Sequence, residues 1–243
     1  MNEQNSQFEA PTIDSGDASN SNTTKPLTLH AHATGPNPIK IAMALEFLQV
    51  PYTIKMWDFG DDAEKGVKGT AFMKINENGR VPALEDPNTG VVSWESGAVM
   101  NYLRRVYDKG GKLGARGQSE QDVVDLEKWE YFLLSTLGPM TGQVNWFRHY
   151  HPQKNEDALN RYVEQTYRCY GIIEGQLAKS NGQSILPGGI TAADLHFEPW
   201  VRQHQFAGLS LDKYPNVAKW LDRMDNLNEV QEAYRKIKEA PKS

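Results

Sequence analysis

The sequence predicts an α/β half followed by an all-helical half. Between residues 25 and 107, four short runs alternate in the two-residue period of β-strands, and segments with helical spacing separate them. Residues 108–117 then contain four glycines and no apolar period, which is typical of a domain boundary. Beyond them, amphipathic helical patterns run to the end of the 243-residue chain, without a convincing strand.

The α/β half begins with a strand and a helix. Residues 26–33 alternate apolar with polar or small side chains, and a turn rich in Gly and Pro follows. We expect Asn37 to cap the helix and Pro38 to occupy its first turn, since Asn caps free amides and proline has a helical φ. A second strand at 52–56 completes a β-α-β unit, which predicts parallel strands and a right-handed connection.

A hairpin and a helix complete this half. Residues 81–85 and 91–94 have strand patterns and are joined by a turn that contains Pro, Asn and Gly. A helix is then expected from Glu95 to about Tyr107. The predicted order of elements is βαβαββα.

We expect the boundary to divide the chain into two domains. The first covers residues 25–108, residues 109–118 form a linker, and the helical domain covers 119–243. Thr191 and Asp194 form a capping box, for which we predict a structural role. The helices predicted in the second domain cover residues 119–137, 156–178, 191–206 and 214–238.

Composition narrows the class of protein. Residues 1–24 are rich in Ser, Asn and acidic residues, so we expect a flexible tail. A net charge of -5 does not favour nucleic acid or anionic membranes, and no apolar run is long enough to span a bilayer. One cysteine, Cys169, excludes an internal disulfide, and the first residues lack the basic start and the apolar segment that are typical of a signal peptide. We therefore expect a soluble, cytoplasmic protein in which Cys169 is a core residue.

Several segments, in order, resemble the glutathione transferases, and within them the fungal and bacterial class related to the yeast nitrogen-regulating prion protein. The segments are Pro36-Asn37-Pro38-Ile39-Lys40, residues 75–84 (INENGRVPAL), Glu95-Ser96-Gly97-Ala98, residues 138–143 (GPMTGQ) and Pro199-Trp200-Val201. The resemblance covers residues 26–238. It implies a thioredoxin-like N-terminal domain followed by the all-helical glutathione-transferase C-terminal domain.

The resemblance also implies how glutathione is held. Val81 and Pro82 stand where the family has a cis proline, so the Val81 backbone would pair with the cysteinyl backbone of glutathione. Ser96 would hold the γ-glutamyl carboxylate at a helix N-terminus and Glu95 the ammonium group. Arg80 would pair with the glycyl carboxylate or be a solvated surface cation, and both readings stay open.

Thiol activation requires hydrogen-bond donors, because a free thiol of pKa about 8.5 is only slightly ionised at neutral pH. Asn37 and Thr34 lie in the turn where the family places the residue that contacts the sulfur. Asn37 is the first candidate and Thr34 the second, since Gly35 lies inserted relative to the family spacing. This turn contains neither tyrosine nor cysteine, which argues against phenol-type and protein-thiolate mechanisms.

By resemblance, the acceptor substrate would lie between the domains, and plain core packing is the alternative for the residues concerned. His149 and His151 lack the carboxylates or cysteines of a zinc signature, so we expect no metal. The candidate acceptor residues are Met140, Gln143, Trp146 and Phe147.

We therefore predict a glutathione S-transferase that adds the glutathione thiolate to an electrophilic carbon of a small apolar substrate. Two alternatives stay open: a glutathione-dependent cis-trans isomerase that acts by transient addition, and a non-catalytic regulator with the same fold. By resemblance the protein is a homodimer, and in a fungus we expect a role in secondary metabolism.

Overall fold

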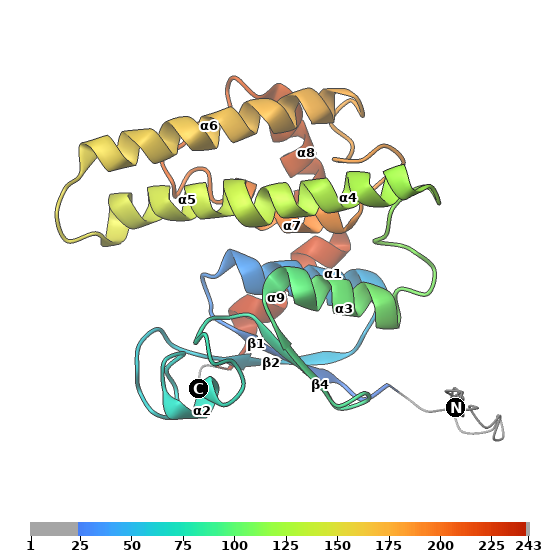
Figure 1. The fold of residues 1–243 in the computed structure, drawn as a ribbon, viewed down its shortest axis with the longest axis vertical. Coiled ribbons are helices and arrows are strands. Elements are labelled where there is room, and N and C mark those ends of the chain that lie inside the picture. The colour runs from blue at the N-terminus through green and yellow to red at the C-terminus, as the bar shows by residue number, and fades with distance from the viewer. Residues whose placement is uncertain (1–23, 242–243) are drawn as a thin grey trace, which may run out of the picture.

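A computed structural model describes residues 24–241 (Figure 1). The predicted flexible tail, apart from Thr24, lies outside the described residues. The first half contains β1 (Leu27–Ala31), α1 (Pro36–Leu48), β2 (Tyr52–Met56), α2 (Thr70–Met73), β3 (Ala83–Asp86), β4 (Val91–Trp94) and α3 (Ser96–Tyr107). The second contains α4 (Glu120–Phe132), η1 (Leu133–Leu137), α5 (Gly138–Asn145), η2 (Trp146–Tyr150), α6 (Glu156–Ala178), α7 (Ala192–Arg202), α8 (Pro215–Asp225) and α9 (Asn228–Glu239).

The first half has the predicted βαβαββα order and forms one mixed sheet. Its strand order is β2-β1-β3-β4. β1 pairs in parallel with β2, as predicted, and antiparallel with β3, while β3 and β4 form the predicted hairpin. This mixed sheet with its helices is the thioredoxin-like fold that the sequence resemblance implied.

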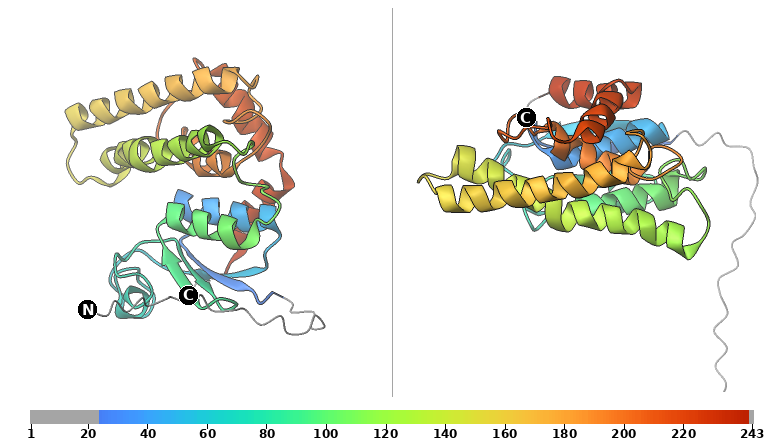
Figure 2. Two further views of the ribbon diagram at one scale, coloured as in Figure 1. Left: turned by 45° about the vertical axis from the view of Figure 1, so that its right-hand side comes forward. Right: turned by 90° about the horizontal axis from the view of Figure 1, so that it is seen from above.

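α1 lies between the sheet and the helical half (Figures 1 and 2). It contacts α3 on one side and α7 and α9 on the other, so all of its residues from Pro38 to Leu45 are buried. The helix begins earlier than predicted, at Pro36, and Gly35 is its N-cap. Asn37 is therefore not the cap. A proline fits the first helical turn because its missing N–H has no partner there, and both Pro36 and Pro38 satisfy this condition.

The second half consists of helices in the described residues. α4, η1, α5 and η2 follow one another without a break, whereas the sequence predicted an end at Leu137; α6 packs against α5 (Figure 1). The helix predicted at 214–238 is two helices. Leu227 between them is extended, with φ -83° and ψ 130°, and packs against the core. This break directs α9 back onto α1.

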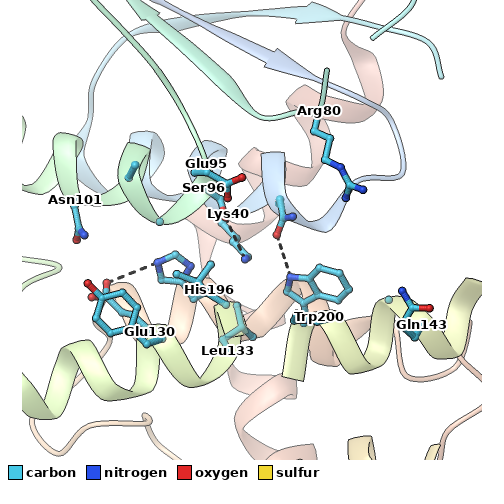
Figure 3. A pocket seen from close by; sticks show the side chains of 18 of the residues that line it. Lys40, Arg80, Glu95, Ser96, Asn101, Glu130, Leu133, Gln143, His196 and Trp200 are labelled. Carbon is cyan, nitrogen blue, oxygen red and sulfur yellow. Dashed lines mark hydrogen bonds and ion pairs between the residues drawn. The ribbon is translucent and has the colours of Figure 1, made fainter. Parts of the chain in front are cut away.

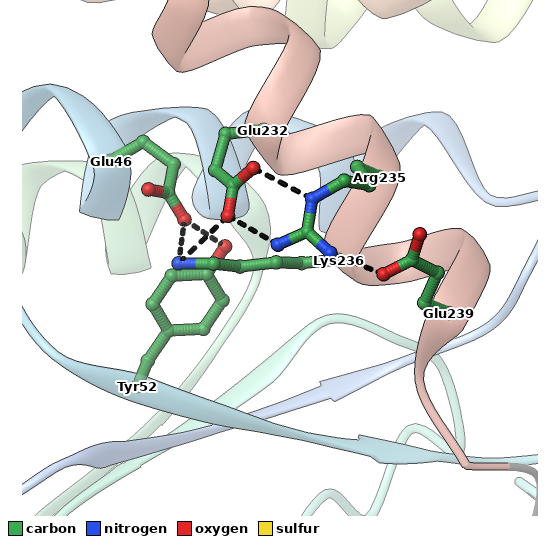
Figure 4. Close-up of polar contacts among 6 residues, drawn as sticks. All are labelled: Glu46, Tyr52, Glu232, Arg235, Lys236 and Glu239. Atoms are coloured by element: carbon green, nitrogen blue, oxygen red, sulfur yellow. Dashed lines mark hydrogen bonds and ion pairs between the residues drawn. The ribbon is translucent and has the colours of Figure 1, made fainter.

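A polar cluster fixes α9 to the first domain (Figure 4). Lys236 of α9 donates to the Glu46 carboxylate of α1 at 2.6 Å, and the Tyr52 hydroxyl of β2 donates to the same oxygen at 2.6 Å. The Lys236 ammonium also lies 4.8 Å from the centre of the Tyr52 ring. Burial, with Glu46 beside it, raises the pKa of Tyr52. Arg235 and Glu232 pair on the outer side of this cluster. The C-terminal helix thus joins both domains.

Candidate functional site

A cleft of about 720 Å³ lies between the two domains (Figure 3). Its first wall comes from α1 and the start of α3, and its second from α4, η1, α5 and α7. The predicted site residues that line the cleft are Asn37, Arg80, Glu95, Ser96, Gln143 and Trp146. The sequence predicted no role in the site for five further lining residues, Lys40, Asn101, Glu130, His196 and Trp200.

Ser96 lies at the start of α3, in the first helical turn that the sequence predicted. The helix begins at Ser96, and Glu95 is its N-cap in a left-handed conformation with φ 68°. Ser96 makes no capping hydrogen bond, and its side chain is 3% exposed. The first amides of a helix carry a partial positive charge. A hydroxyl and free amides therefore meet at this wall of the cleft.

Lys40 adds a buried cation beside Ser96. It follows Asn37 by three residues on α1, is 1% exposed and lines the cleft. Its Nζ donates to Ser96 Oγ at 3.5 Å. Burial lowers the pKa of Lys40 to about 7, and Glu95 partly opposes this shift. A sequence signal for Lys40 exists, because it is the only charged residue in the otherwise apolar run of residues 38–45.

Asn37 points its side-chain oxygen at the second domain. Oδ1 accepts a hydrogen bond from Trp200 Nε1 of α7 at 3.1 Å, and the two residues are 163 positions apart. Because Asn37 is not the helix cap, its amide is free for this contact. The first candidate for thiol activation thus lies inside the cleft.

Thr34 does not line that cleft. It is exposed, and its hydroxyl lies 3.2 Å from His32 Nδ1. It borders a separate depression with Arg202 and Tyr234. The early start of α1 explains this position: Thr34 precedes the N-cap and lies outside the helix mouth. The structure therefore does not bring Thr34 together with Asn37 and Ser96.

Another depression, of about 390 Å³ and distinct from the one beside Thr34, shares Asn37 and Arg80 with the cleft. Val81 and Lys68 line it as well. The Val81–Pro82 peptide is cis, and Pro82 is buried. Val81 lies two residues before Ala83, the first residue of β3, so it stands at the start of this strand, as the sequence predicted.

The four candidate acceptor residues divide into two pairs. Gln143 and Trp146 line the cleft, and Trp146 is 46% exposed. Met140 and Phe147 are not among its lining residues. Phe147 stacks on Tyr162 of α6, with ring centres 5.7 Å apart. The cleft thus includes two of the four candidate acceptor residues, while Met140 and Phe147 are only partly buried elsewhere.

Three charged or titratable side chains meet at one end of the cleft. Arg104 Nη1 donates to both carboxylate oxygens of Glu130, at 3.0 and 3.2 Å, and His196 Nε2 lies 3.7 Å from Glu130. Burial raises the pKa of Glu130 and lowers that of His196. The residues lie on α3, α4 and α7, so no local motif predicts their meeting.

The remaining candidates have structural contacts. His149 stacks on Phe206 at 4.2 Å, and His151 Nδ1 contacts the Gln153 carbonyl. Cys169 is fully buried, as predicted. Within residues 24–241, no group of three or more His, Cys, Asp or Glu side chains could hold a metal ion. No helix in the same range is long and apolar enough to cross a membrane.

Comparisons with known proteins agree with this fold. The family model for the glutathione S-transferase N-terminal domain matches residues 25–105, and the model for the C-terminal domain matches residues 137–228. A glutathione S-transferase-like protein of Aspergillus terreus, gedE, is 35% identical over 78% of this chain and 86% of its own length.

Solved structures give the same result. The glutathione transferase URE2P6 of Phanerochaete chrysosporium, solved with oxidised glutathione, is 32% identical, with a TM-score of 0.80 over 89% of this chain and 98% of its own. The nitrogen regulation fragment of the yeast prion protein Ure2p is 30% identical, with a TM-score of 0.79 over 89% and 99%. Ure2p has also been solved with glutathione. Two matching domains in the family order, with relatives of this identity, show that the chain belongs to the glutathione S-transferase family.

Proposed function

We propose that this protein binds glutathione in the interdomain cleft and adds its thiolate to an electrophilic carbon of a small apolar substrate. The observation that carries this proposal is the position of Asn37. Its amide lies at the N-terminal mouth of α1, and it lines both the cleft with Ser96 and the depression with Val81. The binding of glutathione by related structures supports the choice of ligand.

The polar groups of the site suit the three parts of glutathione. The γ-glutamyl carboxylate would bind Ser96, the first amides of α3 and the Lys40 ammonium, while Glu95 takes the amino group. The cysteinyl backbone would pair with Val81, just before the start of β3. Arg80 would hold the glycyl carboxylate, since it borders the depression beyond Val81. This arrangement directs the cysteinyl sulfur towards Asn37.

The chemistry follows from stabilising the thiolate. An N–H hydrogen bond from Asn37 and the positive end of α1 both favour the charged form of the sulfur, so the thiol loses its proton to water near neutral pH. The thiolate then attacks the electrophilic carbon and forms a C–S bond. In an addition, the displaced electron pair takes a proton from water; in a substitution, it leaves with the leaving group.

The acceptor would bind between Gln143, Trp146 and Trp200, which supply apolar area and one amide. If the acceptor contains an activated double bond, rotation in the adduct followed by loss of the thiolate gives isomerisation instead of conjugation. The similarity to a fungal transferase-like protein supports the proposed role in fungal secondary metabolism.

Turnover of a generic electrophile such as 1-chloro-2,4-dinitrobenzene tests the proposal. We expect glutathione-dependent conjugation by the wild type and a loss of about tenfold to a hundredfold in kcat/KM for Asn37→Ala, since one charge-assisted hydrogen bond is removed. Thr34→Ala is the matched control, with little expected loss. No glutathione-dependent turnover on a broad panel of electrophiles would exclude the transferase.

The Ure2p similarity favours a second candidate, a regulatory protein that binds glutathione without turnover. Calorimetry with S-methylglutathione measures binding alone, so together with the turnover assay it separates the two functions. Binding without turnover favours the regulator, and the absence of binding rules out both.

We also propose a cytoplasmic homodimer. Exposed apolar side chains on β4 and α4 support an interface there, among them Val92, Val124 and Tyr131. Size-exclusion chromatography with light scattering should give twice the mass of the chain, and a monomer peak would contradict the proposal.

A further inference from the structure

The hydrogen bond between Trp200 and Asn37 determines which atom of the Asn37 amide faces which way. The indole N–H is a donor and never an acceptor, so the Asn37 atom at 3.1 Å must be the oxygen. The amide is planar, and its NH₂ group therefore points away from the indole. Within residues 24–241, no other hydrogen bond to the Asn37 side chain occurs, so both of its N–H groups remain available.

Trp200 is itself held in place by α5. A Cβ atom added at Gly138 would lie 3.3 Å from Trp200 Cε2, and one added at Gly142 would lie 3.6 Å from Cη2. The glycines thus let the ring lie directly on this helix. The Lys40 ammonium lies 5.9 Å from the ring centre on the α1 side. The ring is therefore enclosed between α5 and α1, and its N–H stays directed at Asn37.

We propose that Trp200 is a positioning residue for thiol activation: by donating to Oδ1, it orients the N–H groups of Asn37 towards the glutathione sulfur. This inference rests on the proposed function. Without the indole N–H, the amide is free to turn by 180° and present Oδ1 to the sulfur. An oxygen acceptor favours the protonated thiol, whereas an N–H donor favours the thiolate. Trp200 thus changes the thiol pKa through Asn37.

The test measures the pKa of the thiol of bound glutathione from the ultraviolet absorbance of its thiolate. It compares the wild type, Trp200→Phe, Asn37→Ala and the double variant. Trp200→Phe keeps a ring on α5 and removes the N–H. We expect its thiolate fraction at neutral pH to fall about threefold to tenfold, less than the loss of a whole charge-assisted hydrogen bond, because the freed amide still presents an N–H group to the sulfur for part of the time. Because Trp200 acts through Asn37, Trp200→Phe should have no further effect in the Asn37→Ala background.

Each outcome has a distinct meaning. An unchanged thiol pKa in Trp200→Phe, or an equal shift in the Asn37→Ala background, overturns the role of Trp200 and leaves the proposed function intact. A wild type that fails to bind glutathione overturns both. Binding of S-methylglutathione, which has no thiol, should change little in Trp200→Phe, whereas a general disruption of the site would weaken it.

A second measurement needs no change at Trp200. Asn37→Asp keeps an oxygen acceptor for the indole, while Asn37→Leu removes it. We expect hydrogen exchange at one tryptophan indole N–H to be slow in the wild type and Asn37→Asp and faster in Asn37→Leu. Asn37→Asp should still raise the bound-thiol pKa, because a carboxylate cannot donate to sulfur. Equal exchange rates in all three proteins would overturn the hydrogen bond on which the inference depends.

Discussion

The Lys40 ammonium lies 3.5 Å from the Ser96 hydroxyl oxygen, and the two side chains are only 1% and 3% exposed. Glu95 is the acidic group that acts on Lys40 electrostatically, but it is an exposed residue. A lysine in such surroundings is costly to keep protonated. A carboxylate ligand at Ser96 would offset that cost, which makes Lys40 a sensitive reporter of the site.

Lys40 should make stability depend on pH. Its pKa is lowered by burial to about 7, against 10.5 when unfolded. Between these values the unfolded chain holds the extra proton, so stability rises with pH, by at most about 1.4 kcal/mol per pH unit for one group. In urea unfolding, Lys40→Met should lose this rise, and its stability relative to the wild type should be greatest below about pH 7. If the stability of the two proteins had the same pH dependence, the lowered pKa of Lys40 would be contradicted.

Ligand binding should return a proton to Lys40. At about pH 8.5 most of Lys40 is neutral, and a γ-glutamyl carboxylate beside it would raise its pKa and draw a proton from the buffer. Calorimetry of S-methylglutathione in buffers of different ionisation enthalpy measures this uptake without interference from a thiol. We expect uptake in the wild type and none in Lys40→Met, with affinity lowered about tenfold. Equal uptake in both proteins would place the carboxylate elsewhere.

The helices α4 and α7 both begin with a capping box, but the box of α4 is exposed and that of α7 is buried. We expect the buried box to contribute more to the free energy of unfolding. Asp194 is fully buried and accepts from the amides of Ile185 and Thr191 and from Trp220 Nε1, each at 2.9 Å. Asp194→Ala leaves these donors unpaired and should cost about 3–5 kcal/mol. Ser119→Ala, in the exposed box of α4, should cost about 1 kcal/mol. Similar losses of unfolding free energy in the two variants would contradict this account.

The attachment of α9 should be measurable as a coupling between Glu46 and Lys236. Their side chains are 15% and 35% exposed and lie 2.6 Å apart. A double-mutant cycle of Glu46→Gln and Lys236→Met should give a coupling of about 1 kcal/mol at low salt. High salt should reduce it, since the pair is partly exposed to solvent. A coupling near zero at low salt would mean that apolar packing alone holds α9.

Local patterns determined most of the fold. The strands at Tyr52–Met56 and Val91–Trp94 and the helix at Glu156–Ala178 have their predicted bounds, because their periodicity and end signals are local properties. The sequence predicted one helix across Leu227, but the structure has a break there, because Leu227 is extended and packs against the core. Its conformation depends on a distant surface.

The sequence by itself determined the two-domain order and the family, and it supplied the candidate segments for glutathione binding, since each depends on short motifs read along the chain. Only the tertiary structure decided which side chains share the cleft. It placed Thr34 outside and brought Trp200 to Asn37 across 163 residues. It also joined Arg104, Glu130 and His196 from three helices. The physical reason is that hydrogen bonds and desolvation depend on distances in space, which domain packing sets and no sequence period encodes.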